Sequence, residues 1–196
     1  MRLGIAHHYG WAVAVTASAD HTVVDRRRIE LIEPGVPTAP IHHEGGPHLL
    51  HRSGEPLDDD SLAALAALAA LVAEVRASVV RGGMAALDEL EIALPEPIEM
   101  ISVRVWPVDF PEDVAVQRQV PYESRADSVM YCKVLAEIAD QRGWLVQTYD
   151  AKNVEEDAMR TLGDRGNEVL RGPRATLGPP WSKDHRTALA ATIVAT

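Results

Sequence analysis

The first 32 residues contain three runs with the pattern of short β-strands, and in the third run hydrophobic and polar positions partly alternate. Runs rich in Ala, Val and Ile at 2–6, 11–17 and 21–32 are separated by turn residues at Gly10 and 18–20. Side chains along a strand point alternately to opposite faces, and short turns join neighbouring strands in antiparallel order. We therefore expect three antiparallel strands at the start of the chain.

The remaining chain alternates between helical and strand patterns. Leu and Val recur at spacings of three and four from Leu62 to Val79, which predicts an amphipathic helix that Gly82-Gly83 interrupts. The other predicted elements are strands at 98–106 and 144–149, helices at 127–142, 154–162 and 182–194, and a loop rich in Gly, Pro and Arg at 163–180. This order predicts an α/β fold, with a mixed sheet flanked by helices, in a single domain over residues 1–196.

The connection from 33 to 60 is the most irregular part of the chain and is rich in Pro, Gly and His. It holds four of the eight histidines within ten residues, in the set His42, His43, Glu44, His48 and His51. Imidazole and carboxylate groups at this density are suitable ligands for Zn²⁺, Ni²⁺ or Mn²⁺, although their spacing matches no zinc motif. Two interpretations stay open: a metal site that includes His42, His43 and Glu44, or a polar loop.

Composition and charge narrow the class of protein. With 196 residues, 46% of them hydrophobic and 24% charged, the chain fits one ordinary globular domain and is not a wholly disordered protein. Its net charge of −10 means that contact with nucleic acid needs a local basic patch, because Lys and Arg must neutralise phosphates. Residues 165–186 offer such a patch, with five basic side chains against two acidic ones: Arg165, Arg171, Arg174, Lys183 and Arg186. The alternative is that residues 165–186 form an ordinary solvent-exposed connection that contacts no phosphate.

The sequence has no second cysteine for an internal disulfide and no recognisable targeting or membrane-spanning segment. Cys132 is the single cysteine, and the first residues carry neither the basic start nor the apolar core of a secretion signal. The longest apolar stretch, 62–73, is shorter than the roughly 20 residues that a membrane-spanning helix needs. We expect a cytoplasmic protein with no membrane partner.

Four segments carry a resemblance to a known family: Gly4-Ile5, the strand at 98–106, the helix and strand at 127–149, and the sequence DHRTALA at 184–190. From about Arg2 to Ala195 the chain resembles the RuvC-type Holliday-junction resolvases, a branch of the ribonuclease H-like fold. In that family two acids, three residues apart, precede Ala-Leu-Ala in the final helix. They bind divalent metal together with an acid on the first strand and a glutamate on the fourth. The resemblance implies a ribonuclease H-like mixed sheet, Mg²⁺ or Mn²⁺ as cofactor, structured nucleic acid as partner, and a homodimer.

The chain departs from this ligand pattern at several positions. Asp184 matches the first acid of the final helix, but Thr187 occupies the second position. Ala6 stands where the first-strand acid is expected, and Arg104 lies near the position of the strand glutamate. Two-metal cleavage of a phosphodiester needs several carboxylates. Two functions therefore stay open: a metal-dependent nucleic-acid phosphodiesterase with a rebuilt site, for which Zn²⁺ or Ni²⁺ is a further option, or a catalytically inactive module that binds a protein partner or a nucleic-acid structure.

A rebuilt site, in which other ligands replace the carboxylates of the family, would be formed by histidines and Asp184. His7 and His8 follow the first strand directly, and an imidazole can act as a metal ligand or as a general base near neutral pH. Asp184 and His185 lie in the first turn of the final helix, so the candidate catalytic residues are His7, His8, Asp184 and His185, with Asp184 also a candidate metal ligand. The structural alternatives are histidines bonded to loop carbonyls and an acid that only complements the helix dipole.

Overall fold

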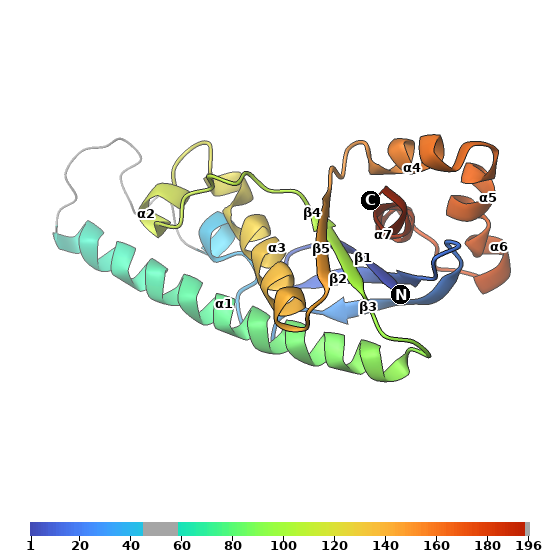
Figure 1. Cartoon of the computed structure of the whole chain (residues 1–196). Helices are drawn as coiled ribbons and strands as arrows, with labels where there is room; N and C mark the ends of the chain where they lie inside the picture. Colours follow the sequence, from blue (N-terminus) through green and yellow to red (C-terminus); the bar gives the residue numbers. More distant parts are fainter. Residues whose placement is uncertain (45–58, 195–196) are drawn as a thin grey trace.

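A five-stranded sheet forms the centre of the protein, in the order β3-β2-β1-β4-β5. The computed structural model describes residues 1–44 and 59–194, without the side chains of 43–44 and 59–61. The strands are β1 (Arg2–His7), β2 (Trp11–Ala17), β3 (Val23–Glu30), β4 (Met100–Arg104) and β5 (Leu145–Tyr149). β2 is antiparallel to β1 and β3, whereas β4 and β5 run parallel to β1 (Figure 1). The predicted mixed sheet is confirmed, and the carboxyl ends of β1, β4 and β5 lie at one edge.

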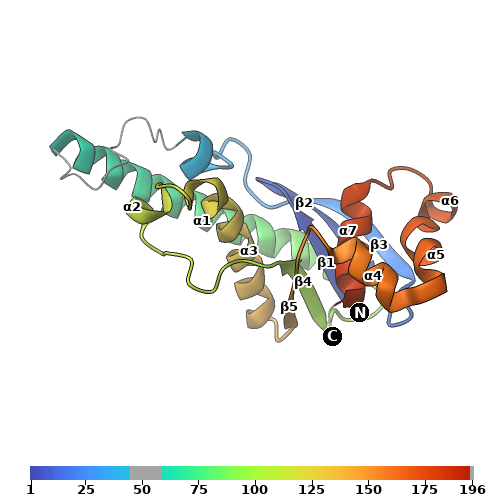
Figure 2. The same ribbon diagram turned by 90° about the horizontal axis from the view of Figure 1, so that it is seen from above.

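Helices cover both faces of this sheet. They are α1 (Asp59–Ala93), α2 (Val114–Gln117), α3 (Glu123–Gln141), α4 (Val154–Leu162), α5 (Gly166–Arg171), α6 (Pro173–Leu177) and α7 (Lys183–Val194), with a π-helical turn, η1 (Pro40–Glu44), and a 3₁₀ turn, η3 (Gly163–Arg165). α1 and α3 pack on one face, and α4, α5 and α7 pack on the other (Figures 1 and 2). The protein is therefore a mixed α/β fold with helices on both sides of the sheet.

Alternation along β1 divides the hydrophobic core in two. Leu3 and Ile5 point towards α1 and α3, where they pack in one cluster with Leu135. Ala6 points to the opposite face, in a cluster with Ala188 of α7. Because both faces of β1 are covered, the strand is apolar along nearly its whole length rather than polar at every second position.

α7 lies directly on the backbone of β1. A Cβ atom on Gly4 would overlap the carbonyl oxygen of Ala188, so this close approach requires glycine. His8, just beyond the end of β1, contacts Asp184 in the first turn of α7. The two elements therefore run in opposite directions, and the start of α7 reaches the edge of the sheet where β1 ends.

The break expected at Gly82-Gly83 does not occur, and this prediction is wrong. α1 continues through both glycines to Ala93. A Cβ atom on Gly82 would lie 2.8 Å from the backbone carbonyl of Leu31, and one on Gly83 would lie 3.0 Å from Cδ1 of Ile138. The glycines thus allow close packing of α1 against its neighbours, and these contacts offset the low helix propensity of glycine.

The loop predicted at 163–180 is also wrong, because most of this segment is helical in η3, α5 and α6. Long-range contacts hold it in place. Trp181 donates from its indole nitrogen to the carbonyl of Leu170 at 2.8 Å. Arg26 of β3 donates to carbonyl groups between Leu177 and Pro180. Arg26 is distant in sequence from its partners, so local composition did not reveal the helices.

By length and composition alone, α1 could span a membrane over Leu62–Ala93, and no other helix in the described part of the chain meets that criterion. The sequence-based expectation counted only the uninterrupted apolar stretch 62–73, which Glu74 and Arg76 follow, whereas the helix continues beyond them. Core helices of other proteins pass the same test. Here α1 contributes Val75 and Leu87 to the core under the sheet, and Arg76 forms an ion pair with Glu137 of α3.

Candidate functional site

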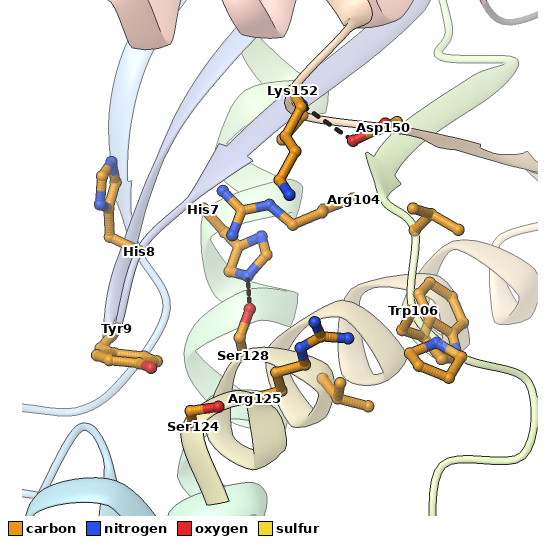
Figure 3. Close-up of a pocket in the computed structure, with 14 residues that line it drawn as sticks. His7, His8, Tyr9, Arg104, Trp106, Ser124, Arg125, Ser128, Asp150 and Lys152 are labelled. Carbon is orange, nitrogen blue, oxygen red and sulfur yellow. Dashed lines mark hydrogen bonds between the residues drawn. The ribbon is translucent and has the colours of Figure 1, made fainter. Parts of the chain in front are cut away.

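A cavity of about 570 Å³ opens at the edge of the sheet where β1, β4 and β5 end. Its walls come from these strand ends, from α3 and from the segment that leads into α4. The polar side chains that line it include His7, Arg104, Arg125, Ser128, Asp150 and Lys152 (Figure 3). In open α/β sheets, ligands commonly bind beyond the carboxyl ends of the strands. The cavity is therefore the first candidate for a functional site.

Arg104, the last residue of β4, brings a partly buried positive charge to the cavity. Its Nε atom is buried and has no hydrogen-bond partner among the described residues. A buried donor that lacks a partner costs about 1–3 kcal/mol. Because Arg104 also lines the cavity, an anion there would meet its positive charge, and Arg104 is the side chain with the clearest capacity to bind a ligand.

His7, the last residue of β1, forms the neutral base of the cavity. Its side chain is almost fully buried, and its Nε2 atom lies 2.9 Å from Oγ of Ser128. Burial lowers the pKa of His7 from 6.5 to about 3, and the charges of Arg104 and His8 add to this effect. The imidazole is therefore uncharged near neutral pH, and it does not compete with Arg104 as a cation.

Two exposed cations stand at the rim of the cavity. Arg125 projects from α3, and Lys152 extends from the loop after β5 towards the space above His7 (Figure 3). The nearby carboxylate of Asp150 already accepts hydrogen bonds from the backbone nitrogen of Lys152 at 3.0 Å and from Nδ2 of Asn153 at 2.8 Å. Asp150 thus organises the start of α4, and the charges that face the cavity are mainly positive.

His8 and Asp184, both predicted as site residues, lie together. The Nε2 atom of His8 is 3.3 Å from Oδ2 of Asp184, and the His8 ring stacks on Trp11 with centroids 4.2 Å apart. His8 also lines the cavity, whereas Asp184 contacts it only through His8. One histidine and one carboxylate form a contact here, which is fewer ligands than a protein metal site normally supplies.

In the described part of the histidine-rich connection, η1 lies beside the site. The backbone nitrogen of His42 donates to the buried carboxylate of Asp127 at 2.9 Å, and its ring lies 6.4 Å from that of Tyr9. The side chains of His43 and Glu44, and residues 45–58 with His48 and His51, lie outside the described part of the chain. Among the described residues, no three His, Cys, Asp or Glu side chains lie close enough to hold a metal ion.

His185 takes a structural place at the start of α7. Its Nδ1 atom accepts a hydrogen bond from the backbone nitrogen of Ser182 at 3.2 Å and lies 2.8 Å from the Ser182 hydroxyl. The ring also packs on Trp181, and burial lowers the pKa of His185. Unlike His7 and His8, His185 does not line the cavity.

The basic patch predicted at 165–186 is divided in space. Arg186 is paired with Glu155 at 3.1 Å, so that its charge is already balanced. Arg165 lines a second cavity of about 430 Å³ beside His21. Arg171, Arg174 and Lys183 are exposed on α5, α6 and α7 and line neither cavity.

The sequence did not indicate Arg125, Ser128 or Lys152 as site residues, and Arg104 stood out only as a departure from an acidic position. A usable signal existed for two of these residues. Arg104 lies two residues before the end of the strand predicted at 98–106, and Lys152 follows the strand predicted at 144–149 by three residues. Parallel strands bring such positions to one edge of the sheet. Arg125 and Ser128 lie on α3, and no local pattern indicates which strand they face.

Comparison with protein-family models, curated proteins and solved structures finds no match to this chain. The function therefore has to be inferred from the geometry and charge of the site.

Proposed function

We propose that this chain is a catalytically inactive ribonuclease H-like module that binds nucleic acid through the cationic cavity. The strand order supports this fold, since an antiparallel β3-β2-β1 unit is extended by β4 and β5 parallel to β1. The packing of α7 across β1 gives further support. This is the arrangement that the resemblance to RuvC-type resolvases implies.

The observation that carries the proposal is the positive charge at the strand ends. Arg104, Arg125 and Lys152 line the cavity, against the single carboxylate of Asp150. Metal-assisted cleavage requires carboxylates that hold two cations, whereas binding of a phosphodiester backbone requires positive side chains. The cavity has the second kind of lining, and this favours binding over cleavage.

Removal of one rim charge is expected to weaken binding of oligonucleotides. Arg125→Gln and Lys152→Gln should each raise Kd several-fold and reduce the slope of log Kd against log salt by about 0.7–0.9, because each variant loses one phosphate contact. Fluorescence anisotropy in EDTA, with single-stranded, duplex, branched and RNA–DNA hybrid substrates, measures both quantities.

Arg76→Gln is the matched control for this measurement. It removes one positive charge from α1, where Arg76 pairs with Glu137 of α3 and lines neither cavity, and it should leave affinity and salt slope unchanged. Equal effects of all three variants would indicate binding by overall charge and would contradict a role for the cavity.

A second candidate function is a metal-dependent phosphodiesterase with a rebuilt site. The contact between His8 and Asp184 favours it, since an imidazole and a carboxylate 3.3 Å apart are two ligands of compatible type. His42 and the neighbouring His43 and Glu44 are the candidates for completing such a set. Mg²⁺ or Mn²⁺ would be the first ions to test, followed by Zn²⁺ and Ni²⁺.

Asp184→Asn separates the two functions. For a binding module, the variant should retain nucleic-acid affinity and lose about 0.3–1 kcal/mol of stability, because the favourable interaction of the acid with the helix dipole is removed. For a phosphodiesterase, it should abolish metal-dependent cleavage of branched, duplex and hybrid substrates. Wild-type protein that cleaves none of these substrates with any of the four ions would exclude the second function.

A cytoplasmic location and a homodimer belong to the same proposal. The exposed alanines on the first half of α1, such as Ala63, Ala66 and Ala70, would permit close approach of a second helix. Sedimentation equilibrium tests the dimer, and cell fractionation tests the location.

A further inference from the structure

We propose that the cavity recognises a terminal phosphate, that is, a phosphate monoester at the end of a nucleic-acid strand, and that it does so without a metal ion. This inference rests on the proposed function and names the ligand group that the cavity would select. It is based on the size of the cavity, the unpartnered Arg104, and the three elements from which its cations come.

The size of the cavity favours a strand end over a continuous backbone. A volume of about 570 Å³ falls in the range of about 300–1,000 Å³ typical of small-molecule sites. A mononucleotide fits in such a space, whereas a duplex does not. The terminal nucleotide of a strand is therefore the part that the cavity can accommodate.

Arg104 supplies the central contact. Its guanidinium reaches the cavity from β4 with a buried Nε atom that has no acceptor among the described residues. A guanidinium presents parallel N–H groups in a geometry that matches two phosphate oxygens, and such charge-assisted hydrogen bonds are about twice as strong as neutral ones. No hydrogen bond from Nε to the described residues competes with this contact.

The number of cations favours a monoester over a diester. Arg104, Arg125 and Lys152 come from β4, α3 and the β5–α4 loop and face one space (Figure 3). A phosphate monoester carries a charge of about −1.5 to −2 at pH 7, against −1 for a diester. Asp150 is the one carboxylate in the lining, and its oxygens accept hydrogen bonds from the backbone nitrogen of Lys152 and from Nδ2 of Asn153.

Ser128 and His7 add a neutral donor. If the Nε2 proton of His7 is donated to Ser128 Oγ, the serine hydroxyl is free to donate into the cavity. His7 is a positioning residue in this arrangement, because it orients Ser128 and does not itself contact the ligand. Its pKa of about 3 keeps it neutral, so it does not repel Arg104.

The wall beside Arg104 is apolar. Val105, Trp106 and Pro107 continue the chain beyond β4 and line the same cavity. An indole ring offers a stacking surface to a base of any identity, worth about 1–3 kcal/mol. The cavity thus combines a cationic region for phosphate with an aromatic wall for the attached nucleotide.

The test compares one single-stranded oligonucleotide with a 5′-phosphate, a 3′-phosphate or hydroxyl groups at both ends, by fluorescence anisotropy in EDTA with an internal label. One phosphorylated form should bind about tenfold or more tightly than the hydroxyl form. A nucleoside monophosphate should compete for the site, and the corresponding nucleoside should not. The two phosphorylated forms distinguish which strand end is recognised.

Arg104→Met is the decisive variant. It removes the charge and keeps an apolar stem of similar length, so it should abolish discrimination between phosphorylated and hydroxyl ends. Because Arg104 has no hydrogen-bond partner in the described part of the chain, the variant should also melt at a temperature no lower than wild type. Arg104→Lys is the second variant. It keeps the charge but lacks the parallel N–H groups of the guanidinium, and it should retain only part of the discrimination. Arg76→Met is the charge-matched control and should retain all of it.

The outcomes separate this inference from the proposed function. Equal binding of all three oligonucleotides, still weakened by Arg125→Gln and Lys152→Gln, would overturn terminal-phosphate recognition and leave nucleic-acid binding in place. Binding of a nucleoside monophosphate without any oligonucleotide would support the phosphate site and overturn the nucleic-acid function. No binding of either ligand would overturn both.

Discussion

Gly4→Ala is expected to lower the free energy of unfolding by about 2–3 kcal/mol, near the upper end of the range for overpacked cores. The added methyl group would overlap the backbone carbonyl of Ala188, and a backbone atom cannot move aside as the end of a side chain can. α7 would have to shift away from β1, and the packing of Leu189 and Ile193 in the adjacent core would be lost in part. Urea denaturation at pH 7.5, with the midpoint compared between variant and wild type, measures the effect.

Gly83→Ala is the matched control, since it adds the same methyl group in α1. There the nearest atom is Cδ1 of Ile138 at 3.0 Å, the flexible end of a side chain, and alanine gains about 1 kcal/mol of helix propensity. The two effects oppose each other, so the stability should change by less than about 1 kcal/mol. Equal destabilisation by both variants would mean that α7 does not lie in contact with the backbone of β1.

Lowering the pH from 7.5 to 5.0 is expected to cost about 2 kcal/mol of stability through His7 alone. In the folded protein the pKa of His7 is held at about 3 by burial, with Arg104 and His8 adding to the shift, whereas in the unfolded chain it is near 6.5. Between these values the unfolded state binds more protons, so stability falls as the pH drops through about 6.5 and stops falling below about 3. The buried neighbour Cys132 has a pKa raised to about 12 and does not titrate in this range.

His7→Gln isolates this contribution, because a glutamine can still donate to Ser128 but does not titrate. Urea denaturation of both proteins at pH 7.5, 6.5, 5.5 and 5.0 should give a loss that is smaller in the variant by about 2 kcal/mol. His21 and His185 also have lowered pKa values, and their contribution is common to both proteins. Parallel pH profiles of variant and wild type would show that the pKa of His7 is not lowered in the folded state.

Under the proposed function, the cavity gives one explanation for Ala6, Thr187 and Arg104, which stand where the resemblance to RuvC-type resolvases implies carboxylates. Ala6 is buried under α7, and Thr187 lies 3.4 Å from Glu155, so neither position directs a charge towards a ligand. Arg104 occupies the end of β4 and directs a positive charge there instead. A cation in this place can take over the neutralisation of phosphate that a metal ion provides elsewhere, but it cannot activate water in the same way.

Local patterns in the sequence were sufficient for most of the regular elements. The strand at 11–17 and the helix at 154–162 have the predicted bounds, and the other strands differ by a few residues at their ends. These elements follow from periodicity, since a strand repeats every two residues and a helix every 3.6, and both can be read from near neighbours. The mixed sheet followed from their order.

Only the tertiary structure decided the places where distant residues meet. The glycine pair in α1 and the helices at 163–177 depend on contacts with Leu31, Ile138 and Arg26, which override local propensity. The site depends on distant contacts still more strongly, because His7 and Ser128 are 121 residues apart in the chain. The sequence predicted the ends of the parallel strands to within two residues. Folding decided which side chains there are buried, paired or left to face a common cavity, because burial and charge balance depend on three-dimensional neighbours.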